Sequence, residues 1–493
     1  MRRLPVSLSS CAFAMALSVS SAFAAIHVAA DGSGDYPTIQ AAIVAAADGD
    51  SIFLGDGTYR GAGNRQLEIS GKALSILSQS DDPTTCVFDG EDQWRFLTTD
   101  GPSTHLQGIG FRNGYFLDED VLDGGGALSY RGGVHTVVGC EFIDNYCTEN
   151  GGAIYILEQA GGVVDVSFCT FSGNEASSGS AYFSQYMRGS VDGCRFENNI
   201  GGVIAHLGSS GSRNGSIRRC TFANNTGIAA FVGGGEVRVE ECVFVGNQSA
   251  QWTLGLAGGS EPPVAVRDCT FVQNSAERGI ISMSYLANPT LERILIAFND
   301  AYAVRYAPNE PEPAILHCSD LHGNTDGDWT GPAADQLGQF GNFSADPIFC
   351  APDDGIFTLD ASSPCLPQNH PDGAWTCDGI VGAEPVGCPT TGLDQTPRLE
   401  SPSAFSLGGP NPTRLPIRYS IQNDGSITDV ELQLFDAAGR LHATLWRGAC
   451  NPGELEGTWA PEKEQSLPTG IYYLELRRSG NVAASRKVVV LSR

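Results

Sequence analysis

The chain has 493 residues, of which 41% are hydrophobic and only 17% charged, so it is long enough for two or more domains and is not a disordered polypeptide. Its 56 acidic and 29 basic residues give a formal net charge of −27. No stretch gathers lysine or arginine into a stripe that could follow a phosphate backbone, which argues against nucleic acid as a partner.

Residues 1–24 have the order of a secretory signal peptide. Arg2 and Arg3 precede an apolar run that closes on Ala22-Phe23-Ala24. A lipoprotein signal at Cys11 fits less well, because most of the apolar residues follow this cysteine instead of preceding it. No later apolar run approaches the roughly 18 residues that a membrane span needs. We therefore expect an exported protein, secreted or on the cell surface, without a membrane span.

Residues 37–47 carry the spacing of a helix. Four apolar residues stand at i, i+3, i+4 and i+7, namely Ile39, Ala42, Ile43 and Ala46. Asp48-Gly49 follows as a stop signal. This pattern predicts one amphipathic helix that caps the N-terminal end of a solenoid.

The pattern Cys-x-Phe-x-x-Asn recurs through the middle of the chain. Its copies begin at Cys140, Cys169, Cys194, Cys220, Cys242 and Cys269, with asparagines at Asn145, Asn174, Asn199, Asn225, Asn247 and Asn274. Ile294, Ile296 and Asn299 continue the series without the cysteine, and we expect Cys318 to open the last coil. A repeat of about 25 residues is too short for a propeller blade and lacks the helical period of ankyrin or tetratricopeptide units.

Each repeat predicts two or three short strands. Apolar and polar positions alternate in Val191-x-x-Cys194-x-Phe196, and a Gly-rich step such as Gly151-Gly152 leads into a second apolar segment. Strands that recur once per repeat pair in parallel with the copies above and below them. We therefore predict an all-β chain with a right-handed parallel β-helix of about eleven coils over residues 26–348.

We expect the repeat asparagines to be architectural rather than catalytic. Asparagine tolerates the left-handed backbone of a sharp corner, and its amide can hydrogen-bond to the next copy in a stack.

Three further segments follow the solenoid. Residues 349–388 are predicted to form a cysteine-bearing closing coil and tail, and residues 389–404, rich in Thr, Pro and Ser, a linker. Regularly spaced alternating segments over residues 405–493 predict a small antiparallel β-sandwich.

Several segments resemble known families. Residues 31–36, 49–54 and 57–59 resemble the opening of pectin-lyase-like and pectin-methylesterase-like β-helices, and residues 341–349 and 362–365 resemble the closing segment of secreted bacterial β-helix-repeat proteins. The Gly-Gly-Ala-Ile and Phe-x-x-Asn words of residues 125–300 resemble repeats of polymorphic outer-membrane proteins, which are surface adhesins. Residues 405–493 resemble the FlgD-like immunoglobulin-like module and the sorting domains of type IX secretion. That resemblance implies an export or attachment signal; the alternative is a terminal β-domain without this role.

Fifteen cysteines are present, one of them Cys11. Stacked parallel strands hold side chains about 4.8 Å apart, longer than the ~3.8 Å between the Cβ atoms of a disulfide, so we expect a buried ladder of free thiols. We expect two disulfides among the cysteines of the closing coil and tail, which are Cys350, Cys365, Cys377 and Cys388. No evident partner exists for Cys86, Cys147 and Cys450, and no close Cys-x-x-Cys pair suggests zinc.

Three motifs could carry chemistry, and each has a plainer structural interpretation. Asn324-Thr325-Asp326-Gly327 copies a polygalacturonase-like motif, but no Gly-His-Gly or Arg-Ile-Lys follows, so we expect a turn. Asp320, Asp326 and Asp328 could serve a Ca²⁺-dependent lyase, yet no lysine is near, so we expect surface turns. His317 and His322 lack a metal-binding spacing. We therefore predict no catalytic, cofactor-binding or metal-binding residue and no cofactor.

Aromatic side chains are stronger candidates, because a flat ring stacks on a sugar face with little loss of rotamer entropy. The candidates are Tyr155, Tyr182, Phe183, Tyr186 and Trp252, most of which we expect to be interior stacks or turn covers. The leading hypothesis is a non-enzymatic binding or structural protein, an adhesin or glycan binder. Its partners would be a glycan or a surface protein and, through the C-terminal domain, export machinery.

The alternative is a carbohydrate-active enzyme, a polysaccharide lyase or hydrolase, on the same scaffold. Three or more carboxylates with an arginine or lysine in one lateral groove would favour the enzyme. A groove lined by aromatic rings and amides alone would favour binding.

Overall fold

The fold is that of a computed structural model in which the chain divides into two compact units, Met1–Cys388 and Pro389–Arg493. The structure describes residues 25–388, apart from short segments at 102, 118–123, 158–161, 185–188, 208–213, 234–235, 258–263, 285–288, 307–313 and 384–385, and the strands between 405 and 491. The predicted signal peptide, the linker 389–404 and Tyr186 lie outside the described residues.

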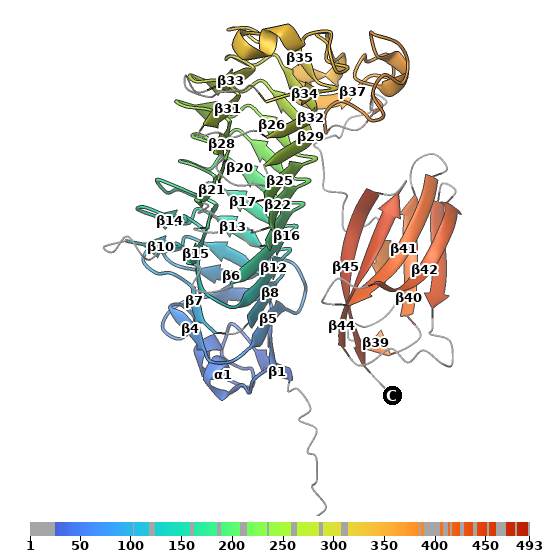
Figure 1. Ribbon diagram of the computed structural model, residues 1–493. Coiled ribbons are helices and arrows are strands. Elements are labelled where there is room, and N and C mark those ends of the chain that lie inside the picture. The colour runs from blue at the N-terminus through green and yellow to red at the C-terminus, as the bar shows by residue number, and fades with distance from the viewer. Residues whose placement is uncertain are drawn as a thin grey trace, which may run out of the picture. The chain divides into compact units, whose positions relative to one another are not determined.

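The first unit is a right-handed parallel β-helix, as predicted, with its coils stacked in chain order (Figure 1). Its largest sheet, sheet A, has 21 strands: β1 (Ala25–Val28), β2 (Ser51–Leu54), β3 (Gly57–Tyr59), β5 (Leu74–Ser78), β6 (Cys86–Asp89), β8 (Ser103–Gln107), β9 (Gly110–Arg112), β12 (Val134–Val138), β13 (Glu141–Ile143), β16 (Val163–Ser167), β17 (Thr170–Ser172), β19 (Gly189–Asp192), β20 (Arg195–Glu197), β22 (Asn214–Arg218), β23 (Thr221–Ala223), β25 (Glu236–Glu240), β26 (Val243–Val245), β29 (Ala265–Val272), β32 (Thr290–Ala297), β34 (Leu316–His317) and β35 (Asp320–His322).

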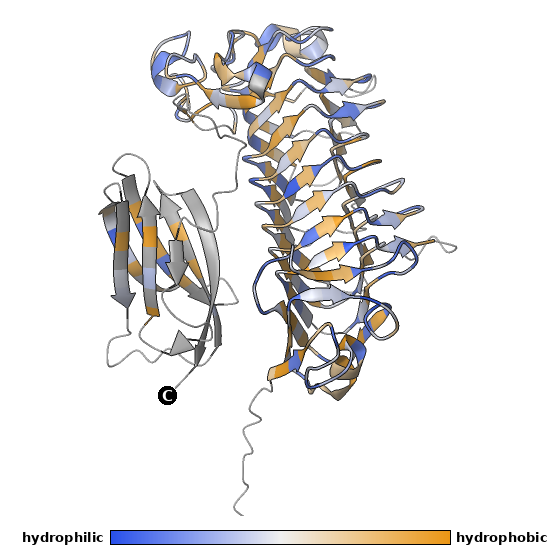
Figure 2. Ribbon diagram, turned by 180° about the vertical axis from the view of Figure 1, so that it is seen from behind, coloured by the Kyte–Doolittle hydropathy of each residue, from blue (hydrophilic) through white to orange (hydrophobic). Residues whose placement is uncertain are grey.

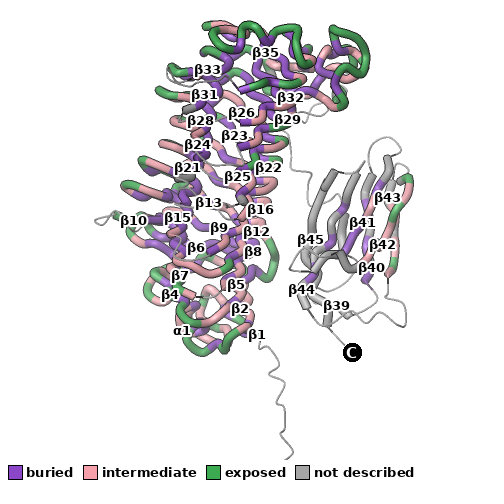
Figure 3. The backbone as a smooth tube through the Cα atoms, in the orientation of Figure 1, coloured by how far each residue is buried: buried purple, intermediate pink, exposed green. Residues whose placement is uncertain are grey.

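The opposite side of the coils forms a ten-stranded sheet, sheet B. Its strands are β4 (Leu67–Ser70), β7 (Leu97–Asp100), β11 (Leu128–Arg131), β15 (Ile154–Leu157), β18 (Tyr182–Ser184), β21 (Ile204–Leu207), β24 (Ala230–Gly233), β28 (Leu254–Ala257), β31 (Ile281–Ser284) and β33 (Val304–Tyr306). Two short parallel pairs connect the sheets, β10 (Tyr115–Phe116) with β14 (Tyr146–Cys147) and β27 (Gln248–Ser249) with β30 (Ser275–Ala276). Apolar and polar residues alternate along many of the strands (Figure 2), and buried residues recur in each coil (Figure 3). The buried apolar residues of the coils form one core.

The repeat phenylalanines form one interior column. Phe142 pairs with Phe171, and Phe171 with Phe196, at equivalent register positions. From Phe111 to Phe271, neighbouring ring centroids in this column are 4.5 to 5.0 Å apart. All of these rings are at most 1% exposed. The predicted stacking at a period of some 25 residues is therefore confirmed.

The repeat asparagines form a parallel column of side-chain hydrogen bonds. Oδ1 of Asn199 accepts the backbone N–H of Asn174 at 3.0 Å and its Nδ2–H at 2.9 Å. The bonding role is as predicted, but the left-handed backbone is not at these asparagines. It is at the preceding residue, for example Asp144 (φ 53°) or Asn198 (φ 55°). The preceding residue adopts the left-handed conformation at the corner, so the ladder asparagine can direct its side-chain amide into the interior.

The N-terminal end of the rod carries α1 (Ile39–Ala45), within the range predicted for the capping helix. The Thr38 side chain accepts the N–H of Ala41 at 3.2 Å and so caps the helix. Ile39, Ala42 and Ile43 are buried in the interior of the first coils. Among the described residues, no helix is both long and apolar enough to cross a membrane.

The C-terminal end of the rod is closed by irregular structure over residues 331–388, which begins before the predicted tail at residue 349. It contains the 3₁₀ helices η1 (Gly331–Gln336), η2 (Pro352–Asp354) and η3 (Pro367–Asn369) and the antiparallel pair β36 (Phe349–Ala351) and β37 (Ile356–Leu359). Phe343, Phe357 and Leu359 pack against Val272 and Leu295 on the outer face of the last coils of sheet A. The tail thereby covers apolar positions that the repeat leaves outside.

Two cysteine predictions need correction. Cys318 is not part of the thiol column: it stands at a left-handed corner (φ 49°), and Ser319 takes the column position, where its hydroxyl accepts the Ile294 N–H at 3.2 Å. Two disulfides occur among the described residues, as expected, but they are Cys318–Cys377 and Cys350–Cys388. Cys365 is a buried free thiol. The corner points the Cys318 side chain outward, and the tail brings Cys377 to it.

The six other repeat cysteines are buried and free, as predicted. Each thiol from Cys169 to Cys269 bonds to a backbone carbonyl two residues earlier, as Cys220 does to Arg218 at 3.1 Å. Burial raises the pKa of the Cys169, Cys194, Cys220 and Cys242 thiols well above the usual value. These thiols are therefore inert packing groups.

The second unit contains the predicted C-terminal antiparallel sheets. One has β38 (Phe405–Leu407), β40 (Ile417–Asn423) and β43 (Gly453–Trp459); the other has β39 (Thr413–Arg414), β45 (Asn481–Leu491), β44 (Gly470–Arg478), β41 (Thr428–Asp436) and β42 (Leu441–Cys450). Every strand pair is antiparallel except β39 with β45. The core between them is built from Ile417, Ile421, Leu432, Leu434 and Leu474.

Candidate functional site

Sheet B carries one continuous outward-facing column, which we call the outer column. Register pairing joins ten residues in it, in chain order Glu68, Thr98, Ser129, Tyr155, Phe183, Ala205, Phe231, Gly255, Ser282 and Arg305. The alternate residues of these strands point inward and form the core. Functional side chains on this face are therefore held at the spacing of paired strands.

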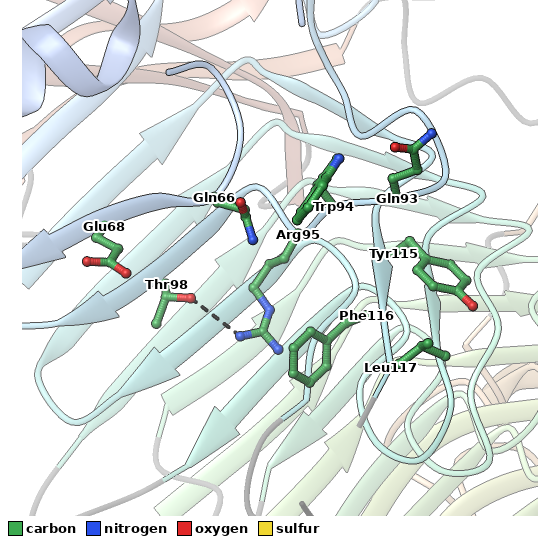
Figure 4. Close-up of a pocket in the computed structure, with 9 residues that line it drawn as sticks. All are labelled: Gln66, Glu68, Gln93, Trp94, Arg95, Thr98, Tyr115, Phe116 and Leu117. Atoms are coloured by element: carbon green, nitrogen blue, oxygen red, sulfur yellow. Dashed lines mark hydrogen bonds between the residues drawn. The ribbon is translucent and has the colours of Figure 1, made fainter. Parts of the chain in front are cut away.

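A pocket of about 320 Å³ lies at the N-terminal end of this column (Figure 4). Its lining consists of Gln66, Glu68, Gln93, Trp94, Arg95, Thr98, Tyr115, Phe116 and Leu117. Strands β4 and β7 supply Glu68 and Thr98 on one side, and β10 with its neighbour supplies Tyr115, Phe116 and Leu117 on the other. The pocket is thus assembled from three successive coils.

Arg95 is the buried centre of the pocket lining. Its Nε–H donates to the Gly125 carbonyl at 2.7 Å, and its Nη2–H donates to the Gly124 carbonyl at 2.5 Å. Its guanidinium also lies over the Phe116 ring, with Cζ 3.6 Å from the centroid. Backbone carbonyls and a ring therefore hold this cation in one orientation.

The rings of the pocket are supported from behind. The Arg65 guanidinium lies 4.9 Å from the Trp94 ring centroid and pairs with Glu91 at 2.7 Å. Tyr115 stacks on Tyr146 of the next coil, with ring centroids 5.2 Å apart. Trp94 and Tyr115 are partly exposed, and Leu117 is 50% exposed. The pocket therefore offers preorganised apolar surface to a ligand.

The polar groups of the lining are two amides, the hydroxyls of Thr98 and Tyr115, the indole N–H of Trp94, one carboxylate and the guanidinium of Arg95. Glu68 is the only carboxylate among the described residues that line the pocket. Glycoside hydrolysis ordinarily uses two carboxyl groups some 5 to 9.5 Å apart. No group of three or more His, Cys, Asp or Glu side chains suited to a metal occurs in the described part of the chain. The lining is thus chemically suited to hydrogen bonding and stacking.

The acidic motif of the last coil is structural, although one residue differs from the prediction. Asp320 was expected in a surface turn, but it lies in β35 and is fully buried. The Ala345 N–H donates to its Oδ1 at 3.1 Å, and the Cys365 thiol contacts its Oδ2 at 3.5 Å. Burial raises the pKa of Asp320 to about 8. The folded-back tail causes this burial, which local sequence does not reveal.

The rest of that motif forms a turn. Asn324 extends the asparagine ladder and donates to the Ile296 carbonyl at 2.9 Å, while Asp328 accepts the N–H groups of Gly323 and Asn324. Asp326 is exposed at the turn. His322 is partly exposed, and its Nδ1 lies 3.4 Å from Ser344 Oγ. His317 instead contacts the Phe340 ring at 5.2 Å. The structure therefore does not assemble these residues into a site.

The aromatic candidates separate into interior and outer groups. Tyr182 points into the core, whereas Tyr155 and Phe183 are stacked in the outer column at 5.4 Å and are almost fully covered. Trp252 is half-buried against Phe231. Sequence reasoning missed the pocket rings Trp94, Tyr115 and Phe116. The available signal was that these rings stand ahead of the first full repeat and fit none of its positions.

The family model described as the right-handed beta helix region matches residues 118–293. No curated protein matches the chain.

Three solved structures share a distant likeness. They are a pectin methylesterase from Aspergillus niger (13% identity, 57% of this chain and 86% of that one, TM-score 0.29), a PL6 family alginate lyase mutant (15%, 76% and 60%, 0.31) and a mannuronic acid specific family 6 polysaccharide lyase from human gut microbiota (11%, 65% and 91%, 0.27). Likeness at this level says nothing about what this chain binds.

Proposed function

We propose that the protein is an exported, surface-located binding protein that recognises glycans through the pocket at the start of the outer column. The observation that carries this proposal is the lining itself: Trp94, Tyr115 and Phe116 present rings, and Gln66 and Gln93 present amides. Rings stack on the apolar faces of sugars, and amides match the paired donor and acceptor character of sugar hydroxyls. Sites of this kind bind by few, well-placed polar groups in an apolar frame.

The same lining supports binding over catalysis. Glu68 has no second carboxylate in the pocket with which to share acid and base roles. Arg95 is committed to the carbonyls of Gly124 and Gly125. A polysaccharide lyase or hydrolase is the alternative function, and it would have to rely on Glu68.

Export is part of the proposal. The disulfides Cys318–Cys377 and Cys350–Cys388 suit an oxidising compartment. The C-terminal β-sandwich would then serve as the export or attachment domain, with the rod presenting its lateral face to a glycan or a surface protein.

The test is binding of the full-length protein to a glycan array, with the bound glycans then assayed for reducing or unsaturated ends. Trp94→Ala should weaken binding about tenfold, which corresponds to ~1.4 kcal/mol, and Trp94→Phe should retain most of it. Trp375→Ala is the matched control, because Trp375 is an exposed tryptophan (71%) of the tail and does not line the pocket.

Two outcomes would overturn the proposal. Equal binding by wild type and Trp94→Ala would place recognition elsewhere. Product release that Glu68→Gln abolishes would establish the enzyme instead. Thermal unfolding of each variant confirms that it is folded.

A further inference from the structure

The C-terminal part of the outer column carries a second pair of rings. Phe231 in β24 and Trp252, which precedes β28, have ring centroids 6.4 Å apart, and both are partly exposed. Gly255 makes room for the indole: a Cβ added there would lie 2.0 Å from Trp252 Nε1 and 2.8 Å from Phe231 Cδ2. The backbone of Gly255 is not left-handed, so packing under Trp252 is what requires glycine there.

Two arginines lie directly beyond these rings, on the next two coils. The Arg278 N–H donates to the carbonyl of Gln251, the residue before Trp252, at 2.6 Å. Arg305 ends the outer column, and its Cβ lies 3.1 Å from the position of a Cβ added to Gly279. Both arginines are exposed. The chain therefore places two exposed arginines on the two coils that follow the Phe231 and Trp252 rings.

These two arginines differ from eight other arginines of the rod. Ion pairs with carboxylates engage Arg60, Arg65, Arg112, Arg195, Arg218, Arg219, Arg267 and Arg293. Arg278 and Arg305, by contrast, form no ion pair and no side-chain hydrogen bond in the structure of residues 25–388. In a chain with 56 acidic residues and 29 basic ones, two exposed arginines without an ion pair on neighbouring coils are available to bind an external anion.

We propose that Phe231, Trp252, Arg278 and Arg305 form a second subsite, which binds the acidic groups of an anionic polysaccharide. The rings stack on a sugar face, and the guanidinium groups bind its carboxylates or sulfate esters, for which their planar fork is well matched. This inference deepens the proposed glycan-binding function, but it depends on other residues than the pocket does.

The position of the subsite favours an extended polymer. Six strand spacings of sheet B separate β7, at the pocket, from β28, a distance of about 29 Å. Both sites lie on the same outer column, so a chain that runs parallel to the rod axis passes over both. The net charge of −27 repels a polyanion with closely spaced charges, such as nucleic acid. The acidic groups of a glycan are more widely spaced, so a few of them can bind the two arginines with less repulsion from the rest of the protein.

The experiment compares two probes on the full-length protein: an eight-residue oligouronate and its fully methyl-esterified, uncharged counterpart. We expect the oligouronate to bind at least tenfold more tightly at low salt and to lose this advantage at 0.5 M salt, because screening weakens exposed charge pairs. The double variant Arg278→Gln/Arg305→Gln should bind both probes equally. Arg267→Gln is the matched control, since it removes an exposed arginine that is already paired with Glu292.

Trp252→Ala separates the contribution of stacking from that of charge, and it should weaken the binding of both probes by a similar factor. Equal binding of the two probes by the wild type, or an unchanged preference in the double arginine variant, would overturn the proposal. Tighter binding of single-stranded DNA or of a polyglutamate peptide than of the oligouronate would also overturn it, because the partner would then be another macromolecule. Trp94→Ala distinguishes the two proposals: unchanged glycan binding by this variant, with the preference for the acidic probe retained, refutes the pocket and not this subsite.

Discussion

The asparagine ladder makes a quantitative prediction at Asn199. Its Oδ1 accepts the backbone N–H and one Nδ2–H of Asn174, and its Nδ2 donates to the Phe171 carbonyl and to Asn225 Oδ1, each at 2.9 to 3.0 Å. All of these groups are buried. Asn199→Ala removes four hydrogen bonds and leaves two donors of Asn174 without an acceptor.

The magnitude follows from those two donors. A buried unsatisfied polar group costs about 1–3 kcal/mol, so Asn199→Ala should lower the free energy of unfolding by about 2–6 kcal/mol. The neighbouring Asn198 is the control, because its side chain is exposed and its substitution affects only the left-handed corner (φ 55°). Asn198→Ala should cost about 1 kcal/mol.

Urea unfolding of the full-length protein, followed by far-UV circular dichroism, measures both variants. Hydrogen exchange at the Asn174 amide provides a local readout, and it should quicken in Asn199→Ala alone. Values for the two variants that agree within about 0.5 kcal/mol would refute the ladder as a stabilising feature.

Three further predictions concern the core and the tail. Phe196→Ala opens a cavity in the ring column and should cost about 3–5 kcal/mol, with a smaller loss for Phe196→Leu, in the same unfolding assay. Asp320 has a folded-state pKa of about 8, above that of an unfolded carboxyl, so the folded state binds the extra proton. Stability should therefore fall as the pH rises from about 4 to about 8, and Asp320→Asn should flatten this slope in thermal unfolding at stepped pH; an unchanged slope would exclude Asp320 as its source. Replacing both Cys318 and Cys377 by serine opens a loop of 59 residues and should cost about 4 kcal/mol in the same unfolding assay; a reducing agent, which also opens Cys350–Cys388, should cost the wild type at least as much.

The interior of the rod could be anticipated from Phe142, Phe171 and Phe196, since each stands at the same place in a recurring pattern and equivalent residues of a solenoid lie over one another although the coils differ in length. The corner could not be assigned to Asn199 or Asn198 from that pattern, because both asparagines fit it and only backbone geometry separates them. Cys318 shows the same limit, as a shift of one position moves its side chain from the column to the surface.

The pocket could not be predicted from the repeat pattern. Trp94, Arg95 and Phe116 come from segments that depart from the pattern, and they meet because successive coils of unequal length place their turns side by side. Asp320 is buried by residues 343–365, which follow it in the chain and match no repeat.

Sequence alone determined the solenoid and its columns of rings, thiols and asparagines, because each coil contacts only its neighbours and the residues that make these contacts recur in every repeat. It also determined the capping helix, through the spacing of its apolar residues. Tertiary structure alone decided the disulfide partners, the burial of Asp320 and the residues that face outward beside one another on sheet B. Those contacts join segments that do not repeat, so no period in the sequence records them.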